Sequence, residues 1–137
     1  MSTIRRFEDL DAWKISRDLC NKIGAKIDAG SFKMNFKLVQ QIEGSSGSIM
    51  DNLAEGFERG TRAEFILFLG YSKGSCGELR SQLYRAFDRK YINQSEFEEL
   101  NMMAVRISIM IQKFISYLQT TTIKGVRKKN TPAPQTS

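Results

Sequence analysis

The sequence predicts an all-α protein: an antiparallel up-and-down four-helix bundle with a disordered basic C-terminal tail. Three observations favour this fold class. Apolar residues recur at helical spacing in four stretches of the chain. Short segments separate these stretches, and short connections join antiparallel neighbours in a bundle. The last part of the chain is polar and basic, contains both prolines and has no apolar periodicity.

We expect helices at about residues 9–29, 35–58, 61–90 and 95–120. Asp9 is the predicted N-cap of the first helix, and Gly30-Ser31 ends it. The second helix is expected to continue through the small residues 44–48, although Gly costs about 1 kcal/mol against Ala in a helix. Its apolar stripe keeps its phase there, and small residues would let a neighbouring backbone approach closely. We predict one domain at residues 1–120 and a tail at residues 121–137.

Two capping boxes predict the starts of the last two helices. Thr61 is followed three residues later by Glu64, and Ser95 is followed by Glu98. In such a box, the hydroxyl and the carboxylate each accept a hydrogen bond from an otherwise unpaired backbone N–H. The third helix also has small residues at its middle, near those of the second helix, because the two helices are joined by a short turn around Gly60.

Composition places the chain among ordinary globular proteins. It has 137 residues, of which 41% are apolar and 26% charged, so wholesale disorder is not expected. No apolar run approaches the ~18 residues that span a bilayer. The first residues lack the apolar core of a signal peptide, and we therefore expect a cytoplasmic protein. Cys20 and Cys76 have no metal-site or CxxC spacing and are interpreted as small buried apolar groups.

The chain contains no histidine, which excludes several kinds of catalytic site. Ser-His and Cys-His pairs, zinc sites with histidine ligands and Glu-x-x-His di-iron centres all need that residue. No metal-ligand or phosphate-loop motif is present either. We therefore predict a protein that is not an enzyme and that has no metal, cofactor or small-molecule substrate.

The positive charge of the chain belongs to its C-terminal end. The net charge is +6, and acidic and basic residues cancel up to Glu99. After Glu99 there are no acids, and the whole excess comes from Arg106, Lys113, Lys124, Arg127, Lys128 and Lys129. The last four form a basic cluster, and flexible basic arms bind phosphate backbones with little sequence discrimination.

A second set of basic residues lies on the predicted third helix. Arg62, Lys73 and Arg80 fall within about 20° of one another on a helical wheel, beside the apolar stripe. Such a row could bind phosphates. The alternative is a solvated basic face without a partner. Of the two sets, the cluster Lys124, Arg127, Lys128 and Lys129 is the better candidate for nucleic-acid binding.

The predicted fourth helix has more apolar surface than a monomeric bundle needs. Met102, Val105 and Ile109 lie together on a face separate from the core stripe. They predict a subunit interface, and the alternative is that they are scattered exposed apolar residues. Asn52, Glu55 and Gly56 near the end of the second helix could form a polar site. We favour a structural role for them, with Gly56 easing the helix end.

Several blocks of residues resemble one known family. They are Phe7-Glu8-Asp9-Leu10 with Trp13-Lys14, Gln41-Ile42, Ser48-Ile49, Asn52-Leu53-Ala54-Glu55-Gly56-Phe57, Glu64-Phe65, Phe68-Leu69, Gly74-Ser75 and Glu78-Leu79. Their order and spacing, over about residues 7–119, are similar to those of the four-helix bundle proteins encoded in 23S rRNA intervening sequences. The resemblance implies an antiparallel bundle that assembles into a ring-shaped homopentamer. A related member, the accessory variability determinant of diversity-generating retroelements, binds nucleic acid and a reverse transcriptase.

Two hypotheses about function remain from the sequence. The first is a non-enzymatic oligomeric scaffold that binds RNA or DNA electrostatically, together with a protein partner such as a reverse transcriptase. The second is a protein-interaction module for which nucleic acid is irrelevant. Salt-dependent binding to RNA distinguishes the two.

Overall fold

The computed structural model describes residues 4–124 of the chain, and their side chains as far as residue 121. This part of the chain has four long helices, one short helix and no strand, which confirms the all-α prediction. The elements are η1 (Phe7–Asp9), α1 (Asp11–Asp28), α2 (Phe36–Glu58), α3 (Arg62–Asp88) and α4 (Gln94–Lys124). None of the helices is apolar over a length that would cross a membrane, among the residues described.

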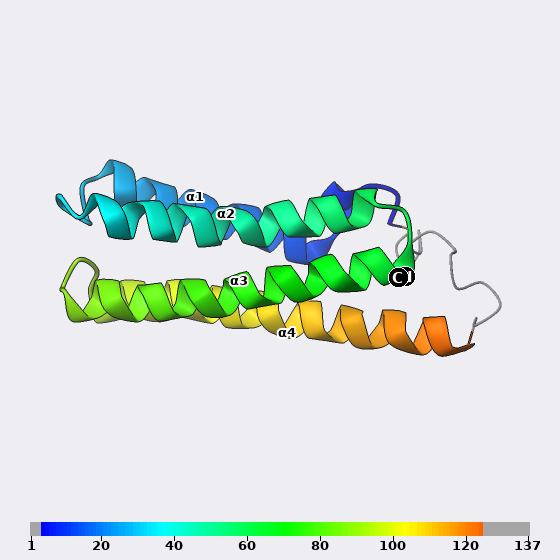
Figure 1. Ribbon diagram of the computed structural model, residues 1–137. Coiled ribbons are helices and arrows are strands. Elements are labelled where there is room, and N and C mark those ends of the chain that lie inside the picture. Colours follow the sequence, from blue (N-terminus) through cyan, green and yellow to red (C-terminus); the bar gives the residue numbers. More distant parts are fainter. Residues whose placement is uncertain (1–3, 125–137) are drawn as a thin grey trace.

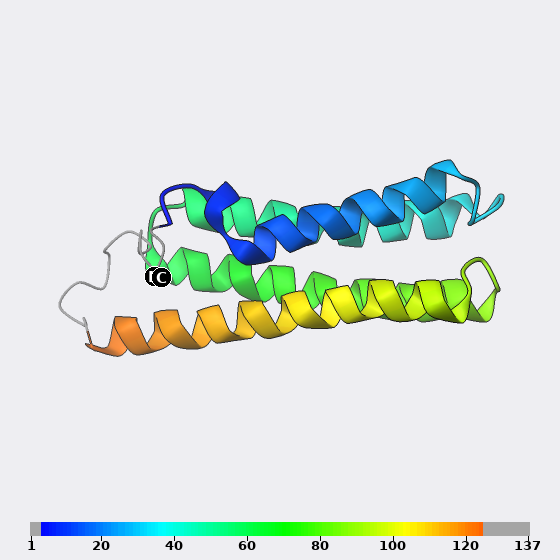
Figure 2. The same ribbon diagram turned by 180° about the vertical axis from the view of Figure 1, so that it is seen from behind.

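The four long helices form an antiparallel bundle in two layers. Figure 1 shows α2 in front of α1 in one layer and α3 with α4 in the other, and Figure 2 shows α1 and α4 from behind. Each helix packs against two neighbours: α1 against α2 and α4, and α3 against α2 and α4. Between the layers lies one continuous apolar core, which includes Leu19, Ile42, Leu79 and Ile107, all fully buried.

The first helix begins two residues later than predicted, because Asp9 has another role. Its carboxylate accepts hydrogen bonds from the backbone N–H groups of Arg5 (3.0 Å) and Arg6 (3.3 Å) and so holds η1 in place. These bonds, the Arg5 bond foremost, lower the pKa of Asp9. Leu10 is the N-cap of α1 and has no side-chain capping bond.

Of the two predicted capping boxes, one is correct in position and the other is wrong. Thr61 caps α3, since its hydroxyl accepts a hydrogen bond from the Glu64 N–H at 3.3 Å, but Glu64 Oε1 accepts the Thr61 hydroxyl at 3.1 Å and not the predicted backbone N–H. The box of α4 is formed by Asn93 and Glu96, and not by Ser95 and Glu98. The Glu96 N–H donates to Asn93 Oδ1, and the Asn93 N–H donates to Glu96 Oε1, both at 2.8 Å.

Helix α4 continues to Lys124, the last residue that the structure describes, whereas the sequence placed its end at about Thr120. The hydroxyls of Thr120 and Thr121 donate to the carbonyls of Ser116 and Tyr117, at 3.0 and 2.9 Å. These bonds keep the threonines paired inside the helix. Lys124 is therefore helical, and residues 125–137 lie outside the described part of the chain.

The small residues at the middle of α2 and α3 are helical as predicted, and two of the serines form buried hydrogen bonds between the helices, of which only that of Ser72 reaches a neighbouring backbone atom. The Ser45 hydroxyl donates to Gln82 Oε1 at 2.5 Å, and the Ser72 hydroxyl donates to the Ile49 carbonyl at 2.7 Å. The glycines in both stretches instead face open space: a Cβ on any of them would have no neighbour within 4 Å. These residues are Gly44, Gly47, Gly70, Gly74 and Gly77.

Close approach between α2 and α3 occurs at Gly56, where the sequence predicted only an easier helix end. A Cβ at this position would lie 2.7 Å from the Cβ of Phe68 and 3.2 Å from Cδ1 of Phe65. Real Cβ atoms do not come that close to another Cβ, so only glycine fits between these aromatic residues without a shift.

Candidate functional site

The row of basic residues predicted on the third helix lies along the seam between α3 and α4. Lys73 donates from Nζ to Gln112 Oε1 of α4 at 2.6 Å, and Arg80 donates from Nε to Asn101 Oδ1 at 3.0 Å. Arg62 stands at the first residue of α3. We call Arg62, Lys73 and Arg80 the seam cations. With a rise of 1.5 Å per residue, they extend over about 27 Å of the helix.

The seam cations have no carboxylate partner in the described structure. Its ion pairs lie elsewhere: Lys22 and Lys26 of α1 pair with Glu99 and Glu96, and Arg59 pairs with Glu55 and Glu64 near the α2–α3 turn. The bonds of Lys73 and Arg80 go to neutral amide oxygens, which orient the two charges without cancelling them. The positive charge of the row is therefore open to an external anion.

Arg62 differs from the other two seam cations in its surroundings. All three are partly buried, but Arg62 alone has a buried Nε atom without a hydrogen-bond partner among the described residues. A buried donor left unpaired costs about 1–3 kcal/mol. The guanidinium group is thus not satisfied by an internal acceptor at that nitrogen.

Helix α4 adds positive charge next to the seam. Arg106 and Lys113 are exposed, and neither forms an ion pair in the described part of the chain. The last turns of α4, which end at Lys124, project beyond the α2–α3 turn in both views (Figures 1 and 2). The remaining residues of the predicted basic cluster, Arg127, Lys128 and Lys129, lie outside the described residues.

The predicted apolar strip on α4 is at the surface. Met102 is 70% exposed and Ile109 is 50% exposed, while Val105 is partly buried. The three side chains, with Met103, Met110, Arg106 and Lys113, line a shallow groove on this helix. We call Met102, Val105 and Ile109 the α4 ridge. No other described element of the protomer covers Met102 and Ile109.

A second exposed apolar surface, on α3, was missed from the sequence. Leu67 and Tyr71 are each about half exposed and lie one turn apart on the side of α3 that faces away from the core. Gly70, Gly74 and Gly77 share this side. We call these five residues the α3 outer face. Their helical phase, opposite to that of the core residues, could have predicted this surface from the sequence.

Asn52, Glu55 and Gly56 have structural roles. The side-chain amide of Asn52 donates to the Ser48 carbonyl at 2.9 Å within α2, and Glu55 pairs with Arg59 at 2.9 Å. Gly56 allows the close contact of α2 with α3. These three residues do not converge on a common point, so the structure brings no polar site together here.

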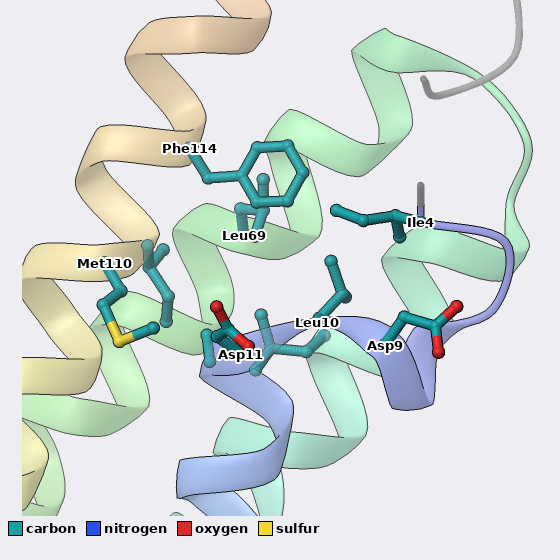
Figure 3. A pocket seen from close by; sticks show the side chains of 10 residues that line it. Ile4, Asp9, Leu10, Asp11, Leu69, Met110 and Phe114 are labelled. Atoms are coloured by element: carbon teal, nitrogen blue, oxygen red, sulfur yellow. The ribbon is translucent and has the colours of Figure 1, made fainter. Parts of the chain in front are cut away.

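An apolar cavity of about 170 Å³ lies where the start of α1 meets α3 and α4. Figure 3 shows Ile4 and Leu10 on one side of it and Leu69, Met110 and Phe114 on the other. The two acids at its rim are occupied: Asp9 caps η1, and Asp11 lies 3.9 Å from Lys14. Without a further polar group the cavity offers no catalytic arrangement, and it is a gap in core packing.

The cysteines carry no reactive chemistry. Cys76 is fully buried, and desolvation raises its pKa to about 12. Desolvation also raises the pKa of Cys20, whose thiol lies 3.2 Å from the Ser46 carbonyl. Both are thiols at neutral pH, whereas nucleophilic or metal-binding cysteines are thiolates. Among the described residues, no group of three or more acids or cysteines could hold a metal ion.

Comparison with known proteins identifies the family. The family model described as 23S rRNA-intervening sequence protein matches residues 8–113. The chain belongs to this family. The match includes all seam cations and the whole α4 ridge, and it ends before Lys124.

A solved structure shows that the fold is shared. A crystal structure from Bacteroides thetaiotaomicron, of a protein of unknown function from the S23 ribosomal protein family, superposes with a TM-score of 0.71. It is 22% identical in sequence, and the alignment covers 76% of this chain and 97% of that one. The comparison with curated proteins gives no match. The solved structure therefore shows that the fold is shared, and its description gives no activity.

Proposed function

We propose that the protein is a non-enzymatic oligomeric scaffold that binds nucleic acid electrostatically. The observation that carries this proposal is the row of seam cations, three positive charges along about 27 Å of α3 without a carboxylate partner. Each phosphate that such a charge neutralises releases condensed counterions, and this release drives binding. Arg106 and Lys113 extend the positive surface, and Lys124, Arg127, Lys128 and Lys129 add positive charge to the chain.

Binding of this kind has little sequence preference. The seam cations project from one helix side, and the neutral partners Gln112 and Asn101 hold two of them in position. Contacts to phosphates fix the orientation of a protein on nucleic acid without reading bases. We therefore propose RNA or DNA backbone as the ligand, and a supporting role in a larger complex instead of sequence recognition.

The oligomeric part of the proposal rests on the α4 ridge. Two exposed apolar side chains, Met102 and Ile109, together with the partly buried Val105 on one helix face are characteristic of a surface that another protein covers. The family resemblance implies a homopentamer, and we carry this stoichiometry as part of the proposal. It is tested by the mass of the full-length protein in light scattering.

A salt titration of RNA binding tests the nucleic-acid part. The triple variant Arg62→Gln, Lys73→Gln, Arg80→Gln is compared with a control that loses three exposed cations elsewhere, Lys14→Gln, Arg17→Gln and Lys33→Gln. Both variants have the same net charge. If the seam cations contact phosphates, only the first variant lowers the slope of log K against log salt, by about 2. Equal losses in both variants, or salt-independent binding, would refute the proposed site.

A deletion tests the contribution of the C-terminal residues. Removing residues 125–137 leaves α4 complete to Lys124, whereas a deletion from residue 121 would shorten the helix. Deletion of residues 125–137 should weaken RNA binding and reduce its salt slope. Circular dichroism should show that the helical bundle is retained. Full binding by the deleted protein would assign the affinity to the bundle alone.

The second candidate function is a protein-interaction module without a nucleic-acid role, which the exposed α4 ridge favours. The reverse transcriptase of the related retroelement protein is the partner that the resemblance implies. This alternative predicts no RNA mobility shift at physiological salt. It also predicts that a purified reverse transcriptase binds the wild type and fails to bind an Ile109→Glu variant.

A further inference from the structure

We infer that the α4 ridge of one copy docks on the α3 outer face of a second copy. The inference deepens the proposed function, because it rests on the proposal that the protein is oligomeric and names the two surfaces that meet. Such a contact is heterologous: two different surfaces of the same chain come together, and repetition of the contact builds a ring or a filament.

The α3 outer face has the shape that a ridge requires. Leu67 and Tyr71 stand at one side of the helix, about half exposed, and Gly70, Gly74 and Gly77 leave the helix surface flat beside them. Glycines on a helix surface let another element approach closely, as small residues do at helix–helix contacts. The open helix surface at Gly74 and Gly77 is where Val105 and Ile109 of a neighbour would pack, with Leu67 and Tyr71 nearer the start of α3.

The glycines of α3 are not required by any close contact among the described residues. A Cβ at Gly70, Gly74 or Gly77 would meet nothing within 4 Å, in contrast to Gly56, where α3 itself fills the space. Glycine weakens a helix interior relative to alanine. Three such residues on one exposed side therefore lower the stability of the free protomer without a packing gain, and a gain on association would offset this.

The part of the α3 outer face at Gly74 and Gly77 lies at the same height along the bundle as the α4 ridge. The bond from Lys73 to Gln112 and the bond from Arg80 to Asn101 fix the register between α3 and α4. Gly74 and Gly77 lie between the two α3 positions, and the whole ridge lies between the two α4 positions, whereas Leu67, Gly70 and Tyr71 precede Lys73 and lie nearer the start of α3. A closed ring allows rotation but no shift along its axis, so two surfaces that pair around a ring must be level. This register allows a second copy to dock with its helices level with those of the first.

The charges beside the two surfaces are complementary. Arg106 and Lys113 border the α4 ridge, and Glu78 lies next to Gly77 at the α3 outer face. All three are exposed and form no ion pair in the described part of the chain. Docking of the ridge brings positive charges toward the neighbour's carboxylate. Complementary charges set specificity and orientation at an interface.

The decisive test places a bulky residue on the α3 outer face. Gly74→Gln fits the free protomer, because the space there is open, but it would block the ridge of a neighbour. Gly44→Gln on α2 is the matched control, since that glycine is equally open and lies in a helix interior. We expect light scattering to give the 15.7 kDa protomer mass for Gly74→Gln and the wild-type mass for Gly44→Gln. Circular dichroism checks that both are folded.

Mixing two defective variants tests which surfaces pair. Ile109→Glu has a damaged ridge and an intact α3 outer face, and Gly74→Gln has the reverse. Each alone is expected to be a monomer. A one-to-one mixture should form a complex of two protomers, because one intact pair of surfaces remains. If the ridge instead paired with the ridge of another copy, Gly74→Gln would assemble with itself and would form no complex with Ile109→Glu. That outcome overturns the inference.

The outcomes separate this inference from the proposed function. If the Gly74→Gln variant remains assembled like the wild type, the docking surface is refuted and the oligomeric scaffold is retained. A wild type that is a monomer at all concentrations refutes both the docking surface and the oligomeric part. RNA binding is measured independently through the seam cations, none of which is changed in these variants.

Discussion

Glycine has opposite consequences at two positions of the same helix. Gly56 is enclosed by Phe68 and Phe65, whereas Gly44 has open space around it. We expect Gly56→Ala to destabilise the protein by about 1–3 kcal/mol, because the added methyl group overpacks the α2–α3 contact. Gly44→Ala should stabilise it by about 0.5–1 kcal/mol. Urea unfolding of the two variants measures the difference, and changes of the same sign would contradict the close contact at Gly56.

Glu96 links helix capping to the contact between α1 and α4. Its carboxylate lies 2.5 Å from Lys26 Nζ and also accepts the Asn93 N–H. The Lys26 bond first, and then the Asn93 bond, lower the pKa of Glu96 below its usual 4.5. The stabilisation of the folded state by ionised Glu96 is therefore complete above pH 4.5 and is lost as the pH falls through the lowered pKa of Glu96.

A pH series of unfolding tests this contribution. Glu96→Gln keeps a capping oxygen but loses the charge, so it should cost about 0.5–1 kcal/mol at pH 7, as partly exposed pairs do. The difference between wild type and variant should shrink as the pH falls below 4.5. A constant difference between pH 7 and pH 3 would show that the charge of Glu96 is not involved.

At the scale of elements, one buried polar contact joins the middle of α2 to α3. The Ser45 hydroxyl donates to Oε1 of Gln82, and both residues are buried. Ser45→Ala leaves that oxygen without its donor and should cost about 1–3 kcal/mol, whereas replacing both partners with apolar residues can be nearly neutral. In urea unfolding, Ser45→Ala with Gln82→Met should therefore recover most of the loss. A double variant as unstable as the sum of its parts would refute the coupling.

The existence of each helix could be predicted from the sequence, but several of its ends could not. Apolar periodicity marks all four helices because the core requires it over many turns. Two capping boxes could start α4, because Asn93 with Glu96 and Ser95 with Glu98 both have the required spacing. The structure uses Asn93, where Lys26 of the distant α1 holds Glu96 in place. The contact between Lys26 and Glu96 thus favours the start of α4 at Asn93, and this contact cannot be predicted from the residues near that start.

The candidate surfaces were predictable to the extent that helical phase determines them. Phase alone grouped the seam cations and the α4 ridge correctly on their helices. It could not show that Lys73 and Arg80 reach Gln112 and Asn101, because that requires the packing of α3 on α4. The glycines of α3 had the phase of an outward face, yet their clustering suggested an internal contact.

At the scale of the whole molecule, assembly and nucleic-acid binding are expected to reinforce each other. One protomer presents three seam cations, and an assembly presents one such row per copy. A nucleic acid long enough to reach two rows binds the second one at a high effective concentration. The number of phosphates neutralised, and hence the salt slope, then increases with the number of rows in contact.

The neutral Gly74→Gln variant tests this coupling without altering the charge of the protein. On an oligonucleotide of about eight residues, which reaches one row, the variant and the wild type should have equal salt slopes. On a strand several times longer, the wild type should bind at least ~10²-fold more tightly and with a slope larger by at least ~2, since at least three further phosphates are then contacted. The Gly44→Gln variant should follow the wild type on both lengths. If Gly74→Gln is monomeric and still matches the wild type on the long strand, each protomer binds nucleic acid independently and assembly has another purpose.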